Sequence, residues 1–225
     1  MKTIVISDIH GCYNELEYLI SLLVENGKYN KETDKLVFLG DYIDRGKDSR
    51  LVIEYIRNLQ KNNKNVIALM GNHEDMLLDY YKGVDDSWTY NGWKTTKESY
   101  LGFEEQFEDD IEWMRNLPLY HEDEHFIYVH AGLDTDKPLN EQDKLTLLWV
   151  REPFIYGKQK YHKRVIFGHT PVLNMGASKP VCTFAKNIDI DTGCVYGGFL
   201  SALMIEDDKI LGFYQVEKEK EKITK

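Results

Sequence analysis

Five short apolar runs, each followed at once by acidic or histidine side chains and usually by glycine, constrain this sequence more than any other feature. The runs hold four to six residues and are rich in Val and Ile, which is typical of buried strands. They span Thr3–Ile6, Lys35–Leu39, Asn65–Met70, Phe126–Val129 and Arg164–Phe167. We expect such a chain to gather polar side chains at one edge of a sheet.

Helical patterns separate the first three runs. Apolar residues recur at spacings of three and four from Leu16 to Val24 and again from Leu51 to Leu59. This alternation of strands and helices predicts βαβ units with a parallel sheet in the first half of the chain. From about residue 187 three strand-like segments predict an antiparallel meander over 187–191, 200–206 and 209–216. The sequence therefore predicts a mixed α/β fold with two sheets.

One domain is expected over residues 1–216, because no internal repeat and no Pro/Gly/Ser-rich linker divides the chain. Residues 83–120 are rich in aromatic side chains and include an acidic stretch at 104–112, which predicts a mostly helical insert. This insert is either a solvated helix face over a local core or a cap that shapes the substrate groove. Residues 217–225 alternate Glu and Lys and predict a charged, solvated tail.

The charge balance excludes several classes of partner. The 225 residues include 28 Lys or Arg and 38 Asp or Glu, and a net charge of −10 lacks the basic footprint of a protein that binds nucleic acid or an anionic membrane. No apolar run approaches the roughly 18 residues of a membrane span. Three cysteines without a Cys-x-x-Cys pair fit a reducing cytoplasm. An anionic substrate therefore requires local cations, either metal ions or inward-facing arginines.

The residues that follow the apolar runs form a candidate metal site. Four of the seven histidines stand there, together with Asp and Asn side chains. Carboxylate and amide oxygens with imidazole nitrogens suit Mn, Fe or Zn. Six ligands are too many for one tetrahedral ion with an open position, but they suit two ions about 3.5–4 Å apart that share a carboxylate. The six candidates are Asp8, His10, Asp41, Asn72, His130 and His169.

Five motifs at these positions carry a resemblance to a known family. Asp-x-His-Gly, Gly-Asp-x-x-Asp-Arg-Gly, Gly-Asn-His-Glu, His-Ala-Gly and Gly-His-Thr begin at positions 8, 40, 71, 130 and 168. Together they resemble the calcineurin-like metallophosphoesterases, and within them the phosphoprotein phosphatase family of serine/threonine phosphatases, in its short bacterial and phage form. The resemblance covers roughly residues 2–205. It implies two packed mixed β-sheets flanked by helices, a four-layer sandwich.

The resemblance also implies a dinuclear metal centre and the roles of its residues. Asp8 and His10 are expected to bind the first metal, and Asp41 is expected to bridge both. The expected ligands of the second metal are Asn72, His130 and His169. Two divalent ions are expected, most of all Mn²⁺, with Fe and Zn as alternatives.

The handling of the phosphoester follows from the same resemblance. His73 is expected to be the general acid for the leaving group, oriented by Asp44. Arg45, Arg151 and Asn72 are expected to bind the substrate phosphate, since a guanidinium fork matches two phosphate oxygens.

Three functions compete. The first is a phosphomonoester hydrolase that removes phosphate from phosphoserine and phosphothreonine, with phosphotyrosine left open, by direct attack of a hydroxide bound to two metals. The alternative is a symmetrical dinucleoside tetraphosphate hydrolase or another small-molecule phosphoesterase. The presence of both Asp44 and Glu74 favours the protein phosphatase. A non-catalytic scaffold is disfavoured because no expected ligand is missing. The expected partner is thus a phosphoprotein or a small phosphoester, and the oligomeric state stays open.

Overall fold

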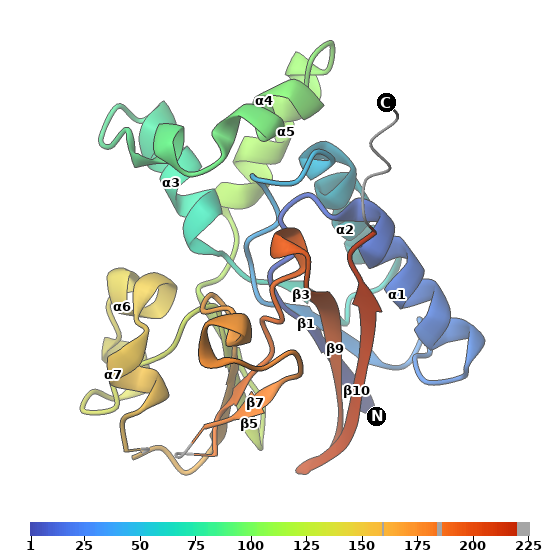
Figure 1. Ribbon diagram of the computed structural model, residues 1–225, viewed down its shortest axis with the longest axis vertical. Coiled ribbons are helices and arrows are strands. Elements are labelled where there is room, and N and C mark those ends of the chain that lie inside the picture. Colours follow the sequence, from blue (N-terminus) through green and yellow to red (C-terminus); the bar gives the residue numbers. More distant parts are fainter. Residues whose placement is uncertain (159, 184–185, 220–225) are drawn as a thin grey trace.

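Two five-stranded β-sheets form the centre of the computed structural model, which describes residues 1–158, 160–183 and 186–219 (Figure 1). The first sheet has the strand order β10-β9-β1-β2-β3 and the second has the order β4-β5-β6-β8-β7. Each sheet mixes parallel and antiparallel pairs. The predicted α/β fold with two mixed sheets is confirmed.

The first sheet contains the predicted parallel half. Its strands β1 (Lys2–Ile6), β2 (Lys35–Phe38) and β3 (Val66–Ala68) run parallel, as expected for βαβ units. The crossover helices are α1 (Tyr13–Glu25) and α2 (Ser49–Asn62). A long hairpin completes the sheet on the other side of β1, and its strands are β9 (Phe199–Glu206) and β10 (Lys209–Glu217).

The second sheet corrects the expected C-terminal meander. Segment 187–191 does not join the hairpin, because β8 (Ile188–Asp189) lies parallel to β6 (Arg164–Phe167) in the second sheet. The chain then crosses to the first sheet through the short helix η4 (Cys194–Tyr196). An apolar strand pattern reports burial but not the sheet in which the strand is buried. The other strands are β4 (Tyr120–Glu122), β5 (Phe126–Val129) and β7 (Val181–Cys182).

The two sheets pack face to face. Val5 and Val37 of the first sheet share one buried cluster with Tyr128 and Ile166 of the second. Because side chains alternate along a strand, the other faces carry different residues and are covered by helices. Ile4 and Leu36 pack with α1 and α2, and the outer face of the second sheet packs on α6 (Lys144–Trp149) and α7 (Glu152–Ile155). The result is four layers.

A group of helices between β3 and β4 completes the molecule on the side of the first sheet (Figure 1). They are α3 (Asn72–Tyr81), η1 (Ser87–Tyr90), α4 (Trp93–Ser99) and α5 (Glu104–Arg115). The Trp88 ring is fully buried among the rings of Tyr80, Tyr81 and Trp93, with centroids 5.3 to 6.1 Å away. The short helices η2 (Leu139–Glu141) and η3 (Val172–Met175) lie in later loops. Among the described residues no helix is long and apolar enough to span a membrane.

Candidate metal centre and active site

The ends of the strands enclose a cavity of about 470 Å³. The loops after β1, β2, β3 and β6 all contribute to its wall. Eight of the residues singled out from the sequence line it, namely Asp8, His10, Asp41, Arg45, Asn72, His73, Arg151 and His169. His130 and Asp44 lie directly behind this lining, where they contact Asn72 and His73. The structure thus brings all ten residues to one place.

Unusual backbone geometry allows the loops to meet. Among the described residues, seven non-glycine residues have positive φ, and five of these are site residues: His10, Asp41, Asp44, Arg45 and His169. Such conformations are sparsely populated and concentrate at functional sites. Glycine is also required at positions 40 and 71, because the two loops touch there. A Cβ on Gly40 would lie 2.4 Å from the backbone nitrogen of Gly71, so only glycine lets the loops after β2 and β3 touch.

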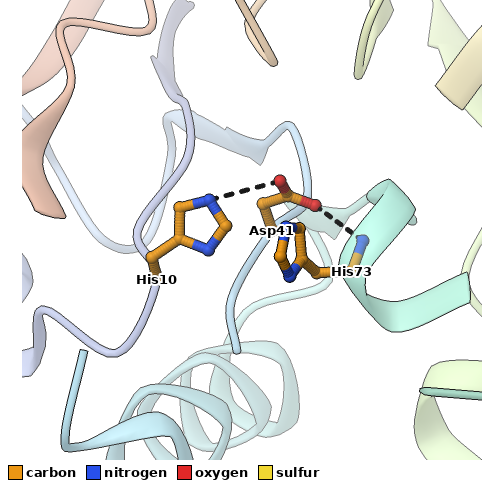
Figure 2. Close-up of side chains that lie close together, drawn as sticks. All are labelled: His10, Asp41 and His73. Carbon is orange, nitrogen blue, oxygen red and sulfur yellow. Dashed lines mark hydrogen bonds and ion pairs between the residues drawn. The ribbon is translucent and has the colours of Figure 1, made fainter. Parts of the chain in front are cut away.

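Asp41 lies at the centre of the site (Figure 2). Its Oδ2 is 3.3 Å from His10 Nε2, and its Oδ1 is 3.5 Å from His130 Nε2. The backbone N–H of His73 also donates to Oδ1, at 3.0 Å. Among the described residues, three groups of side chains are close enough to hold a metal ion, and two of them lie at this cavity: His10, Asp41 and His73, and Asp41, His130 and His169. The third, Cys12, Glu15 and Cys194, does not line the cavity. Both groups at the cavity contain Asp41, as a bridging carboxylate requires.

Two histidines are held in the form that a metal ligand needs. His10 Nδ1 donates to the carbonyl of Ile43 at 2.8 Å, and His130 Nδ1 donates to the carbonyl of Leu39 at 3.0 Å. Because Nδ1 carries the hydrogen, Nε2 of each ring presents a lone pair toward Asp41. A backbone carbonyl that fixes the second ring nitrogen is typical of ligating histidines.

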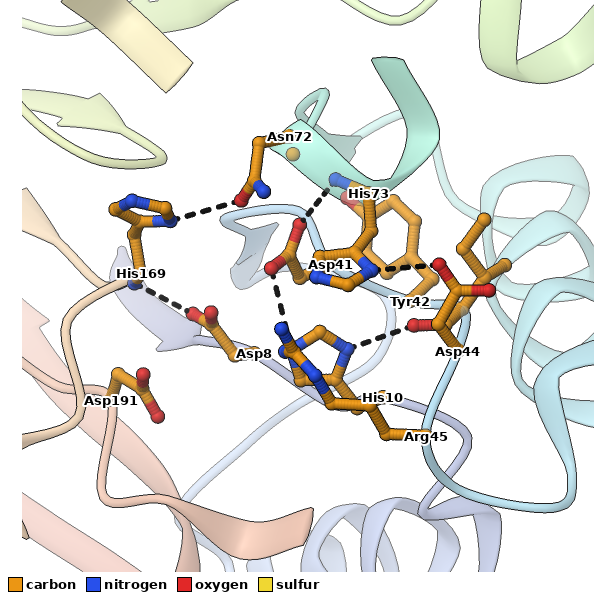
Figure 3. A network of polar contacts seen from close by, with 12 residues as sticks. Asp8, His10, Asp41, Tyr42, Asp44, Arg45, Asn72, His73, His169 and Asp191 are labelled. Carbon is orange, nitrogen blue, oxygen red and sulfur yellow. Dashed lines mark hydrogen bonds and ion pairs between the residues drawn. The ribbon is translucent and has the colours of Figure 1, made fainter. Parts of the chain in front are cut away.

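The far side of the cavity gathers further acceptor atoms (Figure 3). Asn72 Oδ1 lies 2.9 Å from both His130 Nε2 and His169 Nδ1, and the two ring nitrogens are 3.2 Å apart. The other nitrogen of His169, Nε2, is buried without a hydrogen-bond partner. A divalent cation would satisfy this convergence of lone pairs, so the residues fit a metal centre.

Buried negative charge at the same place supports this fit. Asp8, Asp41 and Asp191 all line the cavity and are at most 6 % exposed. Burial, followed by the charge of Asp8, raises the pKa of both Asp41 and Asp191 well above the usual range. Cations between these carboxylates would offset the repulsion and favour their ionised forms. Asp191 was missed from the sequence, although Asp-Thr-Gly after the apolar residues of β8 repeats the pattern of the other strand ends.

His73 and Asp44 form a buried pair beside the metal groups. Asp44 Oδ2 accepts from His73 Nδ1 at 2.7 Å. Asp44 also accepts from Trp88 Nε1 at 2.9 Å and from Thr96 Oγ1 at 2.6 Å. Burial raises the pKa of Asp44 to about 7, and the Thr96 and Trp88 donors act against burial by stabilising the carboxylate. Burial lowers the pKa of His73 well below the usual range.

Trp88 and Thr96 are functional positions that sequence reasoning missed. They come from η1 and α4, within the segment whose sequence left open a local core or a cap. Nothing in the sequence links an indole or a hydroxyl at these positions to Asp44, because the contacts span 44 and 52 residues.

Replacement of Trp88 by phenylalanine tests whether the indole N–H stabilises the Asp44 carboxylate. Loss of the indole donor is expected to raise the pKa of Asp44 further, so the acidic limb of the kcat profile should move to higher pH. A hydrogen bond to a charged group contributes about 1.5–3 kcal/mol, so kcat at neutral pH should fall at least about tenfold with unchanged metal content. Trp93→Phe is the matched control, because Trp93 packs on Trp88 but gives Asp44 no hydrogen bond among the described contacts. A kcat–pH profile of the Trp88→Phe variant that matches the wild type would contradict this role of Trp88.

Glu74 holds the loops of the site together. Its carboxylate accepts from the backbone N–H groups of Asp41 at 2.9 Å, Tyr42 at 2.8 Å and Gly71 at 3.0 Å. Glu74 is fully buried at the start of α3, so it fixes the loop after β2 against the loop after β3. Its contacts are to backbone and do not reach the space open to a substrate.

The two arginines approach different metal groups. Arg45 Nη1 contacts His10 Nε2. Arg151 Nη1 donates to the carbonyl of His169 and to Thr170 Oγ1, both at 3.3 Å. Both side chains line the cavity, so each guanidinium is available to an anion there.

The family model for calcineurin-like phosphoesterases matches residues 1–199. The chain belongs to this family. The resemblance read from the five motifs is therefore confirmed, and calcineurin-like phosphoesterases use a dimetal centre. A solved protein described provisionally as a diadenosine tetraphosphatase has the same fold, with a TM-score of 0.71 and 23% identity over 97% of this chain and 94% of its own.

Sequence relatives of this calcineurin-like phosphoesterase bear the names of nucleotide hydrolases. The asymmetrical bis(5'-nucleosyl)-tetraphosphatase PrpE of Oceanobacillus iheyensis is 32% identical over 90% of this chain and 88% of its own length. A symmetrical bis(5'-nucleosyl)-tetraphosphatase of Erwinia tasmaniensis is 34% identical, but it matches only 59% of this chain and 45% of its own length.

These relatives overturn the preference for a protein serine/threonine phosphatase, which was wrong. That preference rested on the presence of Asp44 and Glu74. The structure gives the reason for the error. Asp44 contacts His73, and Glu74 contacts backbone N–H groups, so both residues support the groups behind the cavity and neither lines the space open to a substrate. Residues of that kind serve any phosphoester substrate and cannot separate a phosphoprotein from a nucleotide.

Proposed function

We propose that this chain hydrolyses dinucleoside tetraphosphates and cleaves them asymmetrically, into a nucleoside monophosphate and a nucleoside triphosphate. The observation that carries the proposal is the similarity to the asymmetrical enzyme over about nine tenths of both chains, whereas the symmetrical one matches over a shorter part. The alternative read from the sequence named a symmetrical hydrolase. The proposal therefore keeps the dinucleoside tetraphosphate as the substrate and changes which phosphoanhydride bond is cleaved.

The proposed ligands are those expected from the sequence. Asp8 and His10 would hold one ion and Asp41 would bridge both, while the second ion would be held by Asn72, His130 and His169. A donor set of oxygens and imidazole nitrogens supports Mn²⁺, with Fe and Zn as alternatives. When bound, such a pair of ions supplies Lewis acidity to a phosphoryl oxygen and lowers the pKa of water.

The chain's own side chains complete the proposed reaction. Asp44 holds the His73 ring through Nδ1, and the opposite ring nitrogen is then free to give a proton to the leaving oxygen. Arg45 and Arg151, with the amide of Asn72, would hold phosphate oxygens that face away from the ions. In a chain of net charge −10, these local cations offset the repulsion of a tetraphosphate.

Replacement of either arginine by alanine is expected to raise KM for a dinucleoside tetraphosphate and to weaken inhibition by inorganic phosphate. Each lost charge-assisted contact is worth about 1.5–3 kcal/mol, so the expected change is about ten- to hundredfold. Metal content should be unchanged, because neither residue is a proposed ligand. Arg115→Ala is the control, since Arg115 pairs with Glu112 at the surface. If Arg151→Ala keeps the wild-type KM and phosphate inhibition constant, Arg151 is a surface cation that does not bind the substrate.

A product assay tests the proposed function itself. Diadenosine tetraphosphate, a phosphoserine peptide and a phosphotyrosine peptide are incubated with the Mn²⁺-loaded protein, and products are separated by anion-exchange chromatography. AMP and ATP in equal amounts are expected, with slower turnover of both peptides. Two molecules of ADP would overturn the asymmetrical cleavage, and turnover of the peptides alone would overturn the nucleotide substrate.

A further inference from the structure

Two partly exposed aromatic rings line the cavity, one linked to His10 through Arg45 and the other beside His169. Tyr196 and Trp149 both line it, and they are 56 % and 36 % exposed. Tyr196 ends η4, which crosses from the second sheet to the first, and Trp149 ends α6 on the second sheet. Large aromatic side chains beside a polar, charged floor are typical of sites that bind an amphipathic ligand.

The Tyr196 side of the cavity combines an aromatic ring, an arginine and a histidine. The guanidinium carbon of Arg45 lies 5.5 Å from the centre of the Tyr196 ring. The same guanidinium contacts His10 through Nη1. A ligand that places a phosphate on Arg45 would therefore bring its next group against Tyr196.

The Trp149 side repeats the combination. The Trp149 ring lies 5.8 Å from the His169 ring at an angle of 81°, so the edge of one ring meets the face of the other. Arg151 follows two residues later and donates to the His169 carbonyl. Pro171 and Leu173 add apolar surface to the lining of the cavity.

We propose that Trp149 and Tyr196 are the two nucleobase platforms of this site, one for each nucleoside of the substrate. The inference rests on the proposed function, because only a dinucleoside has two bases to place at opposite ends of one phosphate chain. Each end then meets an aromatic ring for its base and an arginine for its nearest phosphates. Stacking of a base on an aromatic side chain is worth about 1–3 kcal/mol and tolerates any base. The platforms thus add affinity for nucleosides without selecting adenine.

The first experiment measures kcat/KM for diadenosine tetraphosphate with Trp149→Ala, Tyr196→Ala, Trp149→Phe and Tyr196→Phe. Each alanine variant is expected to lose about 5- to 150-fold, which is the stacking energy of one base expressed as a ratio. The phenylalanine variants keep a ring and should stay near wild type. Tyr90→Ala is the control, because Tyr90 is 79 % exposed and does not line the cavity. Metal content is measured for every variant, since a merely structural role of Trp149 would reduce it through His169.

The second experiment needs no cleavage of a dinucleotide. AMP and ribose 5-phosphate, which differ by the base, compete with p-nitrophenyl phosphate. AMP should inhibit the wild-type protein about 5- to 150-fold more strongly, and the Trp149→Ala/Tyr196→Ala double variant should bring the ratio close to one. If the wild-type protein leaves diadenosine tetraphosphate intact, the proposed function fails and the pairing of two platforms fails with it. If it cleaves that substrate while the alanine variants and the AMP ratio stay unchanged, the platforms alone are overturned.

Discussion

Asparagine in place of Asp41 will abolish hydrolysis and leave the protein with fewer than two bound ions. The two oxygens of Asp41 face different histidines, and the two candidate metal groups at the cavity both contain this residue. A neutral amide cannot offset two cations as a bridging carboxylate does. Because bound metal supplies several kcal/mol of transition-state stabilisation, kcat/KM should fall by at least about 10³-fold.

Metal analysis and steady-state kinetics on the same preparation check this expectation. Asp75→Asn is a matched control, since Asp75 lies on α3 near the cavity but pairs with Lys144 outside it. A circular dichroism spectrum separates loss of metal from loss of fold. Two results would contradict the assignment of Asp41 as a bridging ligand: full activity of the wild-type protein in excess chelator, or an asparagine variant that retains two ions with normal turnover.

His73→Asn is expected to keep both ions and yet lose kcat, by about 10²- to 10⁴-fold on a substrate with a poor leaving group. The reason is the geometry of the ring. Asp44 accepts from Nδ1, which leaves Nε2 available, and a carboxylate partner favours the protonated imidazole that can deliver a proton. The loss of kcat should be large for phenyl phosphate and small for p-nitrophenyl phosphate, because nitrophenolate is a good leaving group that hardly needs a proton.

The same variant distinguishes a general acid from a metal ligand. His73 belongs by distance to one of the candidate metal groups, together with His10 and Asp41. If His73→Asn lost an ion, or if the two phenyl esters slowed equally, the role as an acid would be refuted. Asp44→Asn should reproduce the dependence on the leaving group, since Asp44 acts only through His73. His125→Asn serves as a control at a partly exposed position distant from the cavity.

Much of the fold and of the site could be predicted because the information is local in the chain. The runs at Phe126–Val129 and Arg164–Phe167 match β5 and β6 residue for residue. The carboxyl ends of parallel strands lie along one edge of a sheet, so the residues that follow them come together there. Asp8, Asn72 and His169 therefore meet although they are far apart in the sequence. The polar residues after the runs were therefore enough to find most of the residues that could hold metal ions there.

Other features depend on contacts that no local pattern records. Alternating Ile and Asp over residues 187–191 predicts a strand, yet the pairing of β8 with β6 could not be predicted from that pattern. Trp88 and Thr96 act through hydrogen bonds to a side chain in another loop. The substrate class was misjudged for a related reason: Asp44 and Glu74 are conspicuous in the sequence, while the aromatic residues Trp149 and Tyr196 that line the cavity look like ordinary apolar side chains.

The meeting of loops from both sheets has a consequence for the stability of the folded chain. The hydrogen bond from the His169 N–H to Asp8 joins residues 161 positions apart, and the one between His169 and Asn72 joins residues 97 positions apart. Ions bound among these side chains would close the same long loops. The three cysteines are free, so no disulfide does so. Closing loops of this length costs conformational entropy, which the free energy of ion binding would offset in the folded state alone. The dimetal centre would thus hold the two sheets together only while the ions are bound, unlike a disulfide, and chelation would lower the free energy of unfolding.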